Sequence, residues 1–263
     1  MARVLSLGSG SSGNCFFIGD AESGVLVDAG ISFKAIKTAL EQFEIPLESV
    51  SALLITHEHS DHIKGLSTLI KKTNIPIYAP KETAEYIFEH IPESEGRLHI
   101  INANALICEG KSEFYAFEVY HDSKSAVGYR IKTPDNRMVV YCTDIGHMDD
   151  KVFEHLINAD LNIIEANYDD GMLMCNVSYP FLLKKRISGQ CGHLSNKDCA
   201  DTVCKLYKNG CRRFVLAHLS RENNTPEVAL ETVRGALNNE DLIENEDFEI
   251  CVAPREDARM LIF

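Results

Sequence analysis

The chain has 263 residues, of which 45% are hydrophobic and 25% charged, a composition typical of a globular protein rather than a disordered or fibrous one. Acidic residues outnumber basic residues by 39 to 26, and the net charge of −13 argues against nonspecific binding of nucleic acid or anionic membranes. No apolar run approaches the roughly 18–20 residues that span a bilayer. No secretion signal is visible, and nine cysteines without a CxxC pair favour a reducing cytoplasm.

The predicted elements alternate between strands and helices along most of the chain. Apolar runs bounded by turn residues predict strands at 3–6, 15–18, 25–27, 50–56, 97–101, 113–119, 126–132, 137–142, 161–165 and 214–217. Helices are expected after the capping residues Ser32, Ser195 and Thr225, and over 82–91. Because helices must cover two sheets, we expect a layered sandwich of the α/β or α+β class.

Six polar residues occupy the positions at which apolar strands end. They are Asp28, His57, His121, Asp144, Glu165 and His218. Strands that end at the same edge of a sheet would bring these side chains into one crevice, where functional residues commonly gather.

The segment 57–62 reads HEHSDH and places three imidazoles and the carboxylate of Asp61 within six residues. Alternation in an extended segment puts His57 and His59 on one side, while Asp61 and His62 turn into a predicted helix that contains Ile63, Leu66 and Ile70. Two donor pairs suit two adjacent metal ions, and imidazole with carboxylate suits Zn²⁺, Mn²⁺ or Fe²⁺ better than Ca²⁺. The HExxH protease motif is absent, because its last position is Asp61.

These residues resemble the motifs of the metallo-β-lactamase fold hydrolases over nearly the whole chain. Val27-Asp28-Ala29-Gly30 resembles the first motif, and residues 57–62 resemble the second. The third, fourth and fifth motifs are resembled by His121, Asp144 and His218. The resemblance implies a single domain over 1–263, of the α+β class, folded as a four-layer αββα sandwich. It implies two divalent metal ions, one bound by His57, His59 and His121, the other by Asp61, His62 and His218, with Asp144 bridging them. Asp28 and Glu165 are expected to support the ligands without binding metal.

Four further segments resemble the YycJ/WalJ/VicX group of metal-dependent nucleases. They are LGSGSSGNC at 7–15, IEANYD at 164–169, CGHLSN at 191–196 and AHLS at 217–220. This resemblance implies exonuclease action on DNA, in which a metal-bound hydroxide attacks phosphorus. We expect Asp61 and His193 to be catalytic, His193 by contacting the scissile phosphate or protonating the leaving group.

Candidate substrate contacts lie outside the ligand motifs. The loop 8–14 either cradles a terminal phosphate or is only a tight hairpin loop. The predicted contacts are Ser11, Ser12, Asn14, Asn167, Lys124 and Arg221.

Charge is unevenly distributed along the last third of the chain. Residues 181–213 carry eight basic and two acidic residues, a balance of +6, and the range 237–263 has a balance of −6. The basic segment is either a solvated face or a phosphate-binding surface near the metals.

Two alternatives to a DNA exonuclease remain open from the residues alone. One is a hydrolase of a small phosphodiester or a thioester, and the other is a regulatory protein that retains the metal site. Nucleic acid, most directly DNA, is the expected partner, with no membrane, and the oligomeric state is open.

Overall fold

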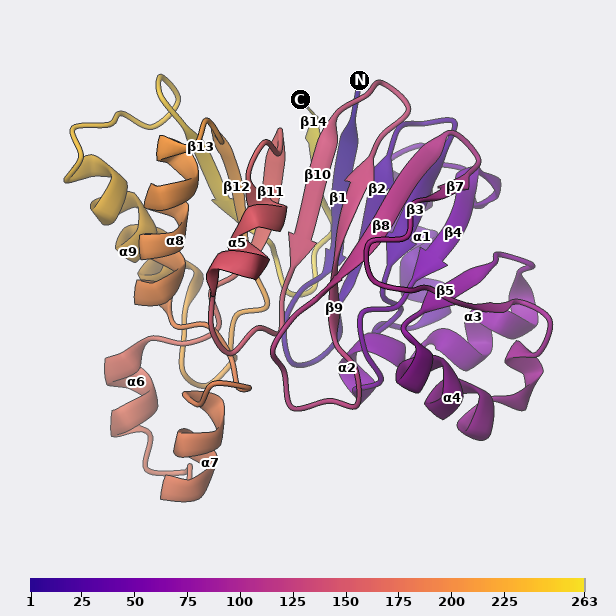
Figure 1. The fold of residues 1–263 in the computed structure, drawn as a ribbon, viewed down its shortest axis with the longest axis horizontal. Coiled ribbons are helices and arrows are strands. Elements are labelled where there is room, and N and C mark those ends of the chain that lie inside the picture. Colours follow the sequence, from indigo (N-terminus) through magenta and orange to yellow (C-terminus); the bar gives the residue numbers. More distant parts are fainter. Residues whose placement is uncertain (263) are drawn as a thin grey trace. The chain divides into compact units, whose positions relative to one another are not determined.

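A computed structural model describes residues 1–262, which form two compact units (Figure 1). The first contains residues 1–118 and 123–137 and the C-terminal strand, and the second contains residues 119–122 and 138–253. The single domain expected over 1–263 stays a prediction.

The first unit contains a mixed sheet in the strand order β14-β1-β2-β3-β4-β5-β6. Strands β14, β1, β2 and β3 are antiparallel, whereas β3, β4, β5 and β6 are parallel. A meander, β7-β8-β9, follows in antiparallel order. The strands are β1 (Arg3–Gly8), β2 (Cys15–Gly19), β3 (Gly24–Val27), β4 (Val50–Leu54), β5 (Ile77–Ala79), β6 (Leu98–Ile100), β7 (Ile107–Glu109), β8 (Ser112–Glu118), β9 (Val127–Lys132) and β14 (Arg259–Ile262).

The helices of this unit are amphipathic and bury their apolar faces. They are α1 (Phe33–Gln42), α2 (Ser60–Ile63), α3 (Leu66–Lys72) and α4 (Lys81–His90), with 3₁₀ turns at Leu47–Ser49 and Pro92–Ser94. The predicted cap Ser32 begins α1, and its Oγ accepts a hydrogen bond from the backbone N–H of Ala35. Ile36 and Leu40 of α1 join Leu26, Leu53 and Ile77 in one hydrophobic core.

The prediction of one continuous helix after the histidine segment is wrong. The segment that contains Ile63, Leu66 and Ile70 divides into α2 and α3 at Gly65. The backbone N–H of Gly65 donates to the carbonyl of Ala29 over 2.7 Å, and a Cβ on Gly65 would lie 2.0 Å from the carbonyl oxygen of Ile31. The chain bends there because the backbone after β3 approaches too closely for any other residue.

The second unit contains four parallel strands in the order β10-β11-β12-β13. The strands are β10 (Met138–Cys142), β11 (Leu161–Glu165), β12 (Arg213–Ala217) and β13 (Glu249–Val252), and the helices are α5 (Asp150–Leu156), α6 (Asp170–Cys175), α7 (Phe181–Ile187), α8 (Asn196–Lys208) and α9 (Pro226–Asn238). The predicted caps are confirmed, because Ser195 accepts from the N–H of Asp198 and Thr225 accepts from the N–H of Val228. Parallel order places the carboxyl ends of β10, β11 and β12 at one edge.

None of the helices in residues 1–262 combines the length and the apolar character that a membrane crossing requires.

Candidate metal centre

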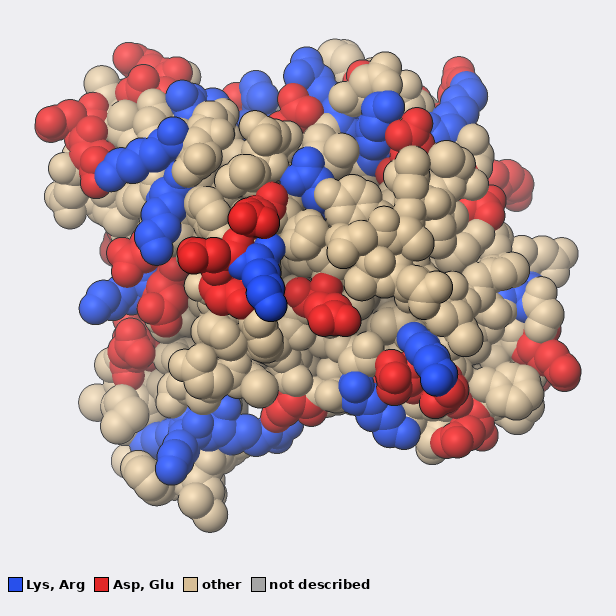
Figure 2. Space-filling model, viewed as in Figure 1, with Lys and Arg blue, Asp and Glu red and all other residues tan. Residues whose placement is uncertain are grey.

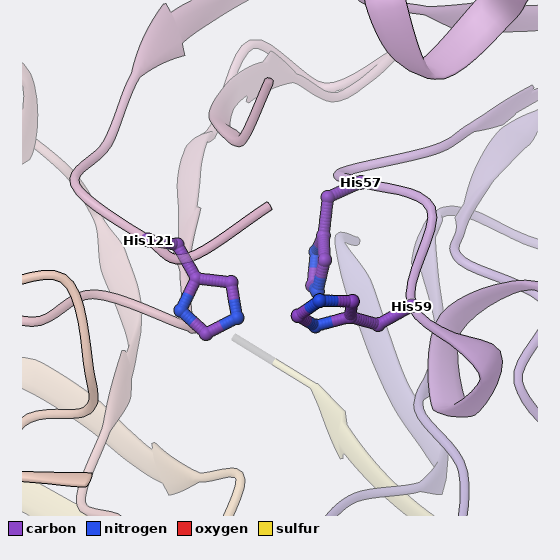
Figure 3. A group of neighbouring side chains, drawn as sticks. All are labelled: His57, His59 and His121. Atoms are coloured by element: carbon purple, nitrogen blue, oxygen red, sulfur yellow. The ribbon is translucent and has the colours of Figure 1, made fainter. Parts of the chain in front are cut away.

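The segment after β4 brings three histidines of the first unit together. The side chains of His57 and His62 are fully buried, and their ring centroids are 4.1 Å apart. The rings of His57 and His59 meet edge to face with centroids 4.6 Å apart, as Figure 3 shows. The alternation expected for these two residues therefore places both imidazoles on one side of the segment. His121, which Figure 3 also labels, belongs to the second unit.

A buried carboxylate orients this group of histidines. Asp28 follows β3 and is fully buried, and its Oδ2 accepts a hydrogen bond from Nδ1 of His62 over 2.7 Å. Its Oδ1 accepts from the backbone N–H of Thr56, whose hydroxyl donates to Oδ2 over 2.9 Å and lies 3.0 Å from Nδ1 of His57. A carboxylate that fixes the ring of a ligating histidine is a recurrent feature of metal sites. The supporting role of Asp28 beside a metal stays a prediction.

Burial raises the pKa of Asp28 above its ordinary value, and the hydrogen bonds from His62 and Thr56 offset only part of that effect. Thr56 was not among the predicted site residues. Its position directly before the histidine segment, at the end of a buried strand, is the signal that could have identified it.

Asn14, whose contact with substrate stays a prediction, lies against two candidate ligands. Its side chain is fully buried, and its Nδ2 lies 3.1 Å from Nε2 of His62 and 3.3 Å from Oδ2 of Asp61. Its Oδ1 accepts from the N–H of Gly10, so Asn14 ties the glycine loop to two candidate ligands. Ser11 and Ser12 of that loop are exposed.

Close backbone packing holds Asp61 in the same region. A Cβ on Gly30 would lie 1.7 Å from the carbonyl oxygen of Asp61. The glycine of the VDAG motif is therefore required for the approach of the two segments.

The second unit gathers a separate group of candidate ligands at the edge where its strands end. Single ligand atoms of Asp144, Glu165, His193 and His218 all lie within 4.8 Å of one another. The carboxylate oxygen Oδ1 of Asp144 is 3.4 Å from Nδ1 of His218 and 3.8 Å from Nε2 of His121. A dense group of this kind, mostly buried, is suited to a divalent cation.

Three of the predicted site residues have left-handed backbones although none is a glycine. The φ angles are 61° at Asp28, 56° at Asp144 and 56° at His218, and each residue lies just beyond the end of a strand. Such conformations cost about 1–3 kcal/mol each and cluster at functional sites.

Glu165 connects most of the second group. It is fully buried at the end of β11, and its Oε1 accepts hydrogen bonds of 2.8 Å from Nδ1 of both His193 and His218. Its Oε2 accepts from the backbone N–H groups of Ile145 (2.9 Å) and Leu194 (3.1 Å). Glu165 therefore orients two rings at once, and its supporting role beside a metal stays a prediction.

Electrostatics in this group shifts the pKa values of Glu165 and of the neighbouring His193 in opposite directions. Burial acts to raise the pKa of Glu165, but His193 and His218 outweigh it and hold the pKa well below its ordinary value. Burial acts to lower the pKa of His193, yet Glu165 and Asp144 raise it above the usual range. Burial dominates at His121, and the pKa of that ring is lowered.

Asn167 and His121 are fixed by neighbouring backbone. Nδ2 of Asn167 donates to the carbonyl of His218 over 2.9 Å and lies 3.3 Å from Nδ1 of the same residue. Asn167 is buried and holds His218, and its contact with substrate stays a prediction. Nδ1 of His121 donates to the carbonyl of Gly192 over 3.0 Å, which fixes the tautomer of His121.

The two predicted basic contacts are both exposed. Lys124 donates its backbone N–H to Oε1 of Glu58 over 2.8 Å, and its ammonium lies 5.1 Å from the centre of the Tyr86 ring. Arg221 is exposed in the loop between β12 and α9.

The residues present fit divalent metal ions. Within each unit the donors are imidazoles and carboxylates, and His62, His121 and His218 each have Nδ1 bonded to an oxygen of the protein. At His121 and His218 that pattern leaves Nε2 as the ring atom with the geometry of a ligand, whereas Nε2 of His62 also lies 3.1 Å from Nδ2 of Asn14.

Comparisons with known proteins agree with this chemistry. A family model described as "Beta-lactamase superfamily domain" matches residues 24–219. The Exodeoxyribonuclease YycJ of Bacillus anthracis is 35% identical over 247 residues, covering 93% of this chain and 92% of that protein. The Exodeoxyribonuclease WalJ of Streptococcus pneumoniae is 36% identical over 250 residues, covering 93% and 91%.

Among solved structures, Zn²⁺-bound PqqB from Methylobacterium extorquens has a TM-score of 0.74 at 16% identity, covering 98% of this chain and 99% of that one. The four-layer αββα sandwich of the α+β class is thereby confirmed. The chain belongs to the β-lactamase superfamily and, within it, to the family of YycJ and WalJ.

Proposed function

We propose that the chain is a metal-dependent phosphodiester hydrolase that acts as an exonuclease on DNA. Two relatives that match more than nine-tenths of the chain are named exodeoxyribonucleases, and both units present donors suited to divalent ions. The nine cysteines, none of which is spaced as CxxC, favour a cytoplasmic location. One catalytic domain over 1–263 is part of the same proposal.

The proposed ligand set is the one that the motif resemblance implies, and it would hold two ions. His57, His59 and His121 would hold one ion, Asp61, His62 and His218 would hold the other, and Asp144 would be shared by the two. Zn²⁺, Mn²⁺ and Fe²⁺ all suit these donors. When bound, such ions supply Lewis acidity for a phosphoryl group and lower the pKa of water.

The arrangement of His193 on Glu165 is the single observation that carries the hydrolytic proposal. Nδ1 of His193 donates to Glu165, which leaves Nε2 as the ring atom that can donate to a substrate oxygen. The same carboxylate oxygen orients His218, so one buried group aligns a candidate ligand and a candidate proton donor. A site that only stored metal would not need this second, partly exposed ring.

Digestion of end-labelled DNA and RNA, single-stranded and double-stranded, with Mn²⁺ and Zn²⁺ compared, tests the proposal. We expect mononucleotides to be released from one end of DNA, and the Asp61→Ala variant to release none. Hydrolysis of bis(p-nitrophenyl) phosphate but not of an S-acyl glutathione would separate this function from thioester hydrolysis. Intact DNA under both metals would refute the exonuclease.

A further inference from the structure

The paired helices α6 and α7 of the second unit leave large apolar side chains in solvent. No residue of α7 is buried, and Phe181 and Leu182 are 71% and 78% exposed. Val177, in the turn between the helices, is 98% exposed. Figure 1 shows α6 and α7 close together, and Nζ of Lys184 donates to the carbonyl of Met174 over 2.6 Å. Exposed apolar groups that cluster in this way mark interaction sites.

The same surface is basic in a strongly acidic protein. Residues 171–197 contain no Asp or Glu, the longest such stretch in a chain that has 39 acidic residues. Lys184, Lys185 and Arg186 lie consecutively in α7, directly after the exposed apolar pair, and Figure 2 shows blue side chains gathered over this part of the molecule. Arg186 pairs with Asp122, whereas the side chain of Lys185 is exposed. The surface therefore offers both apolar contact and positive charge.

Close packing connects this surface to the candidate site of its own unit. The carbonyl of Ile187, the last residue of α7, accepts the backbone N–H of His193 over 2.8 Å. A Cβ on Gly192 would lie 2.1 Å from that same carbonyl oxygen, and the carbonyl of Gly192 accepts from His121. The end of α7 is thus held by backbone contacts to His193 and to Gly192, whose carbonyl in turn accepts from His121.

We propose that the α6–α7 surface, residues 170–187, binds a single-stranded stretch of the nucleic acid substrate. Phe181 and Leu182 contact bases, and Lys185 contacts phosphate. An aromatic ring beside basic side chains is the combination that holds single strands without reading their sequence. This inference rests on the proposed nuclease function, because it assigns to the surface the strand that enters the site beside His193.

Fluorescence anisotropy of a labelled oligothymidylate tests the surface in the full-length Asp61→Ala chain, which binds without cutting. Adding Phe181→Ala and Leu182→Ala together should weaken binding roughly tenfold, as expected for the loss of base stacking. Adding Lys185→Gln should reduce the slope of log Kd against log salt by about 0.7. Phe88→Ala on α4 and Lys205→Gln on α8 are the matched controls, exposed residues of the same kinds elsewhere, and should change neither quantity.

Several results would overturn the proposed surface. Unchanged binding in the Phe181/Leu182 variant would overturn it. Weakening by Lys205→Gln equal to that by Lys185→Gln would also overturn it, because it would indicate diffuse attraction to the whole basic segment. Cosedimentation of the chain with phosphatidylserine vesicles, lost in the Phe181/Leu182 variant while its oligothymidylate binding is intact, would assign the surface to a membrane. A dimer that this variant dissociates, with binding intact, would assign it to a second copy of the chain.

The failure of the proposed nuclease function can be distinguished from the failure of the proposed binding surface. Each variant is checked by circular dichroism and thermal melting, so that a folding defect is not mistaken for lost binding. Wild-type chain that binds oligothymidylate through this surface but cleaves no phosphodiester would refute the nuclease and leave the binding surface standing. Surface variants that still cleave DNA and bind oligothymidylate with unchanged affinity would refute the binding surface and leave the nuclease standing.

Discussion

Replacing Glu165 by glutamine should reveal how much the second unit depends on one buried carboxylate. The side chains have nearly the same shape, so the change removes the charge and one acceptor while leaving the volume intact. Glu165 accepts hydrogen bonds from two histidine rings through Oε1 and from the backbone N–H groups of Ile145 and Leu194 through Oε2. The amide oxygen of glutamine can accept from only one of these two pairs of donors. Its NH₂ group then faces the other pair, so those two donors lose their acceptor.

The cost follows from the number of donors that lose their acceptor. An unsatisfied buried donor costs about 1–3 kcal/mol, so two of them cost roughly 2–6 kcal/mol of unfolding free energy. A typical domain has about 5–15 kcal/mol in total, so the loss should be plain in a urea titration. Glu249→Gln is the matched control, because Glu249 pairs with Arg213 at the surface, and such pairs contribute about 0–1 kcal/mol.

The assay is urea unfolding of chelator-treated protein at pH 7, repeated at lower pH. Because the pKa of Glu165 is lower in the folded chain, its stabilising contribution is complete above the unfolded pKa of about 4.3 and is lost as pH falls through the folded pKa. The difference between wild type and Glu165→Gln should therefore shrink below about pH 4. A loss at pH 7 under about 1 kcal/mol, equal to that of the control, would refute the reasoning.

Three further changes test other parts of the candidate site. Asp28→Asn should weaken metal binding about 10–100-fold in a chelator competition, because it removes the acceptor that orients His62, and unchanged affinity would contradict that role. His193→Ala should keep its metal content but lose turnover by about 10²-fold or more. The control His90→Ala, on the exposed face of α4, should keep its turnover. Near-normal turnover of His193→Ala would show that His193 is not catalytic. Gly30→Ala should destabilise the chain by about 1–3 kcal/mol in thermal unfolding because its Cβ meets backbone at 1.7 Å, while Gly235→Ala in α9, with open space around it, should stabilise it by up to about 1 kcal/mol.

Much of the local structure could be predicted from neighbouring residues. The caps Ser32, Ser195 and Thr225 begin helices as expected, because a capping hydroxyl and the N–H that it accepts are three residues apart. The predicted strands match β1–β4, β6 and β8–β12 within about two residues. Short or partly exposed elements were not predicted, among them β5, β7, β13 and the helices α5–α7, because three to seven residues with little periodicity carry no clear pattern.

The candidate site likewise contains some contacts that follow from sequence spacing and others that do not. That His57, His59, Asp61 and His62 are close together follows from their spacing, because the chain itself joins them. The partners of Glu165 do not follow from spacing, since they lie 20 to 53 positions away along the chain. They meet because β11 and β12 pair in parallel with Glu165 opposite Ala217, which places His218 directly beyond the same edge.

The sequence alone therefore determined the chemistry of this protein: which residues offer imidazole and carboxylate donors, and that they stand where strands end. Only the tertiary structure decided what each polar group contacts. Asn14 and Asn167, the predicted substrate contacts, are buried against candidate ligands, and Phe181 and Leu182 at the start of α7 are exposed. The physical reason is that burial and hydrogen-bond partners depend on sheet register and on backbone approach, and both are set by segments far apart in the chain.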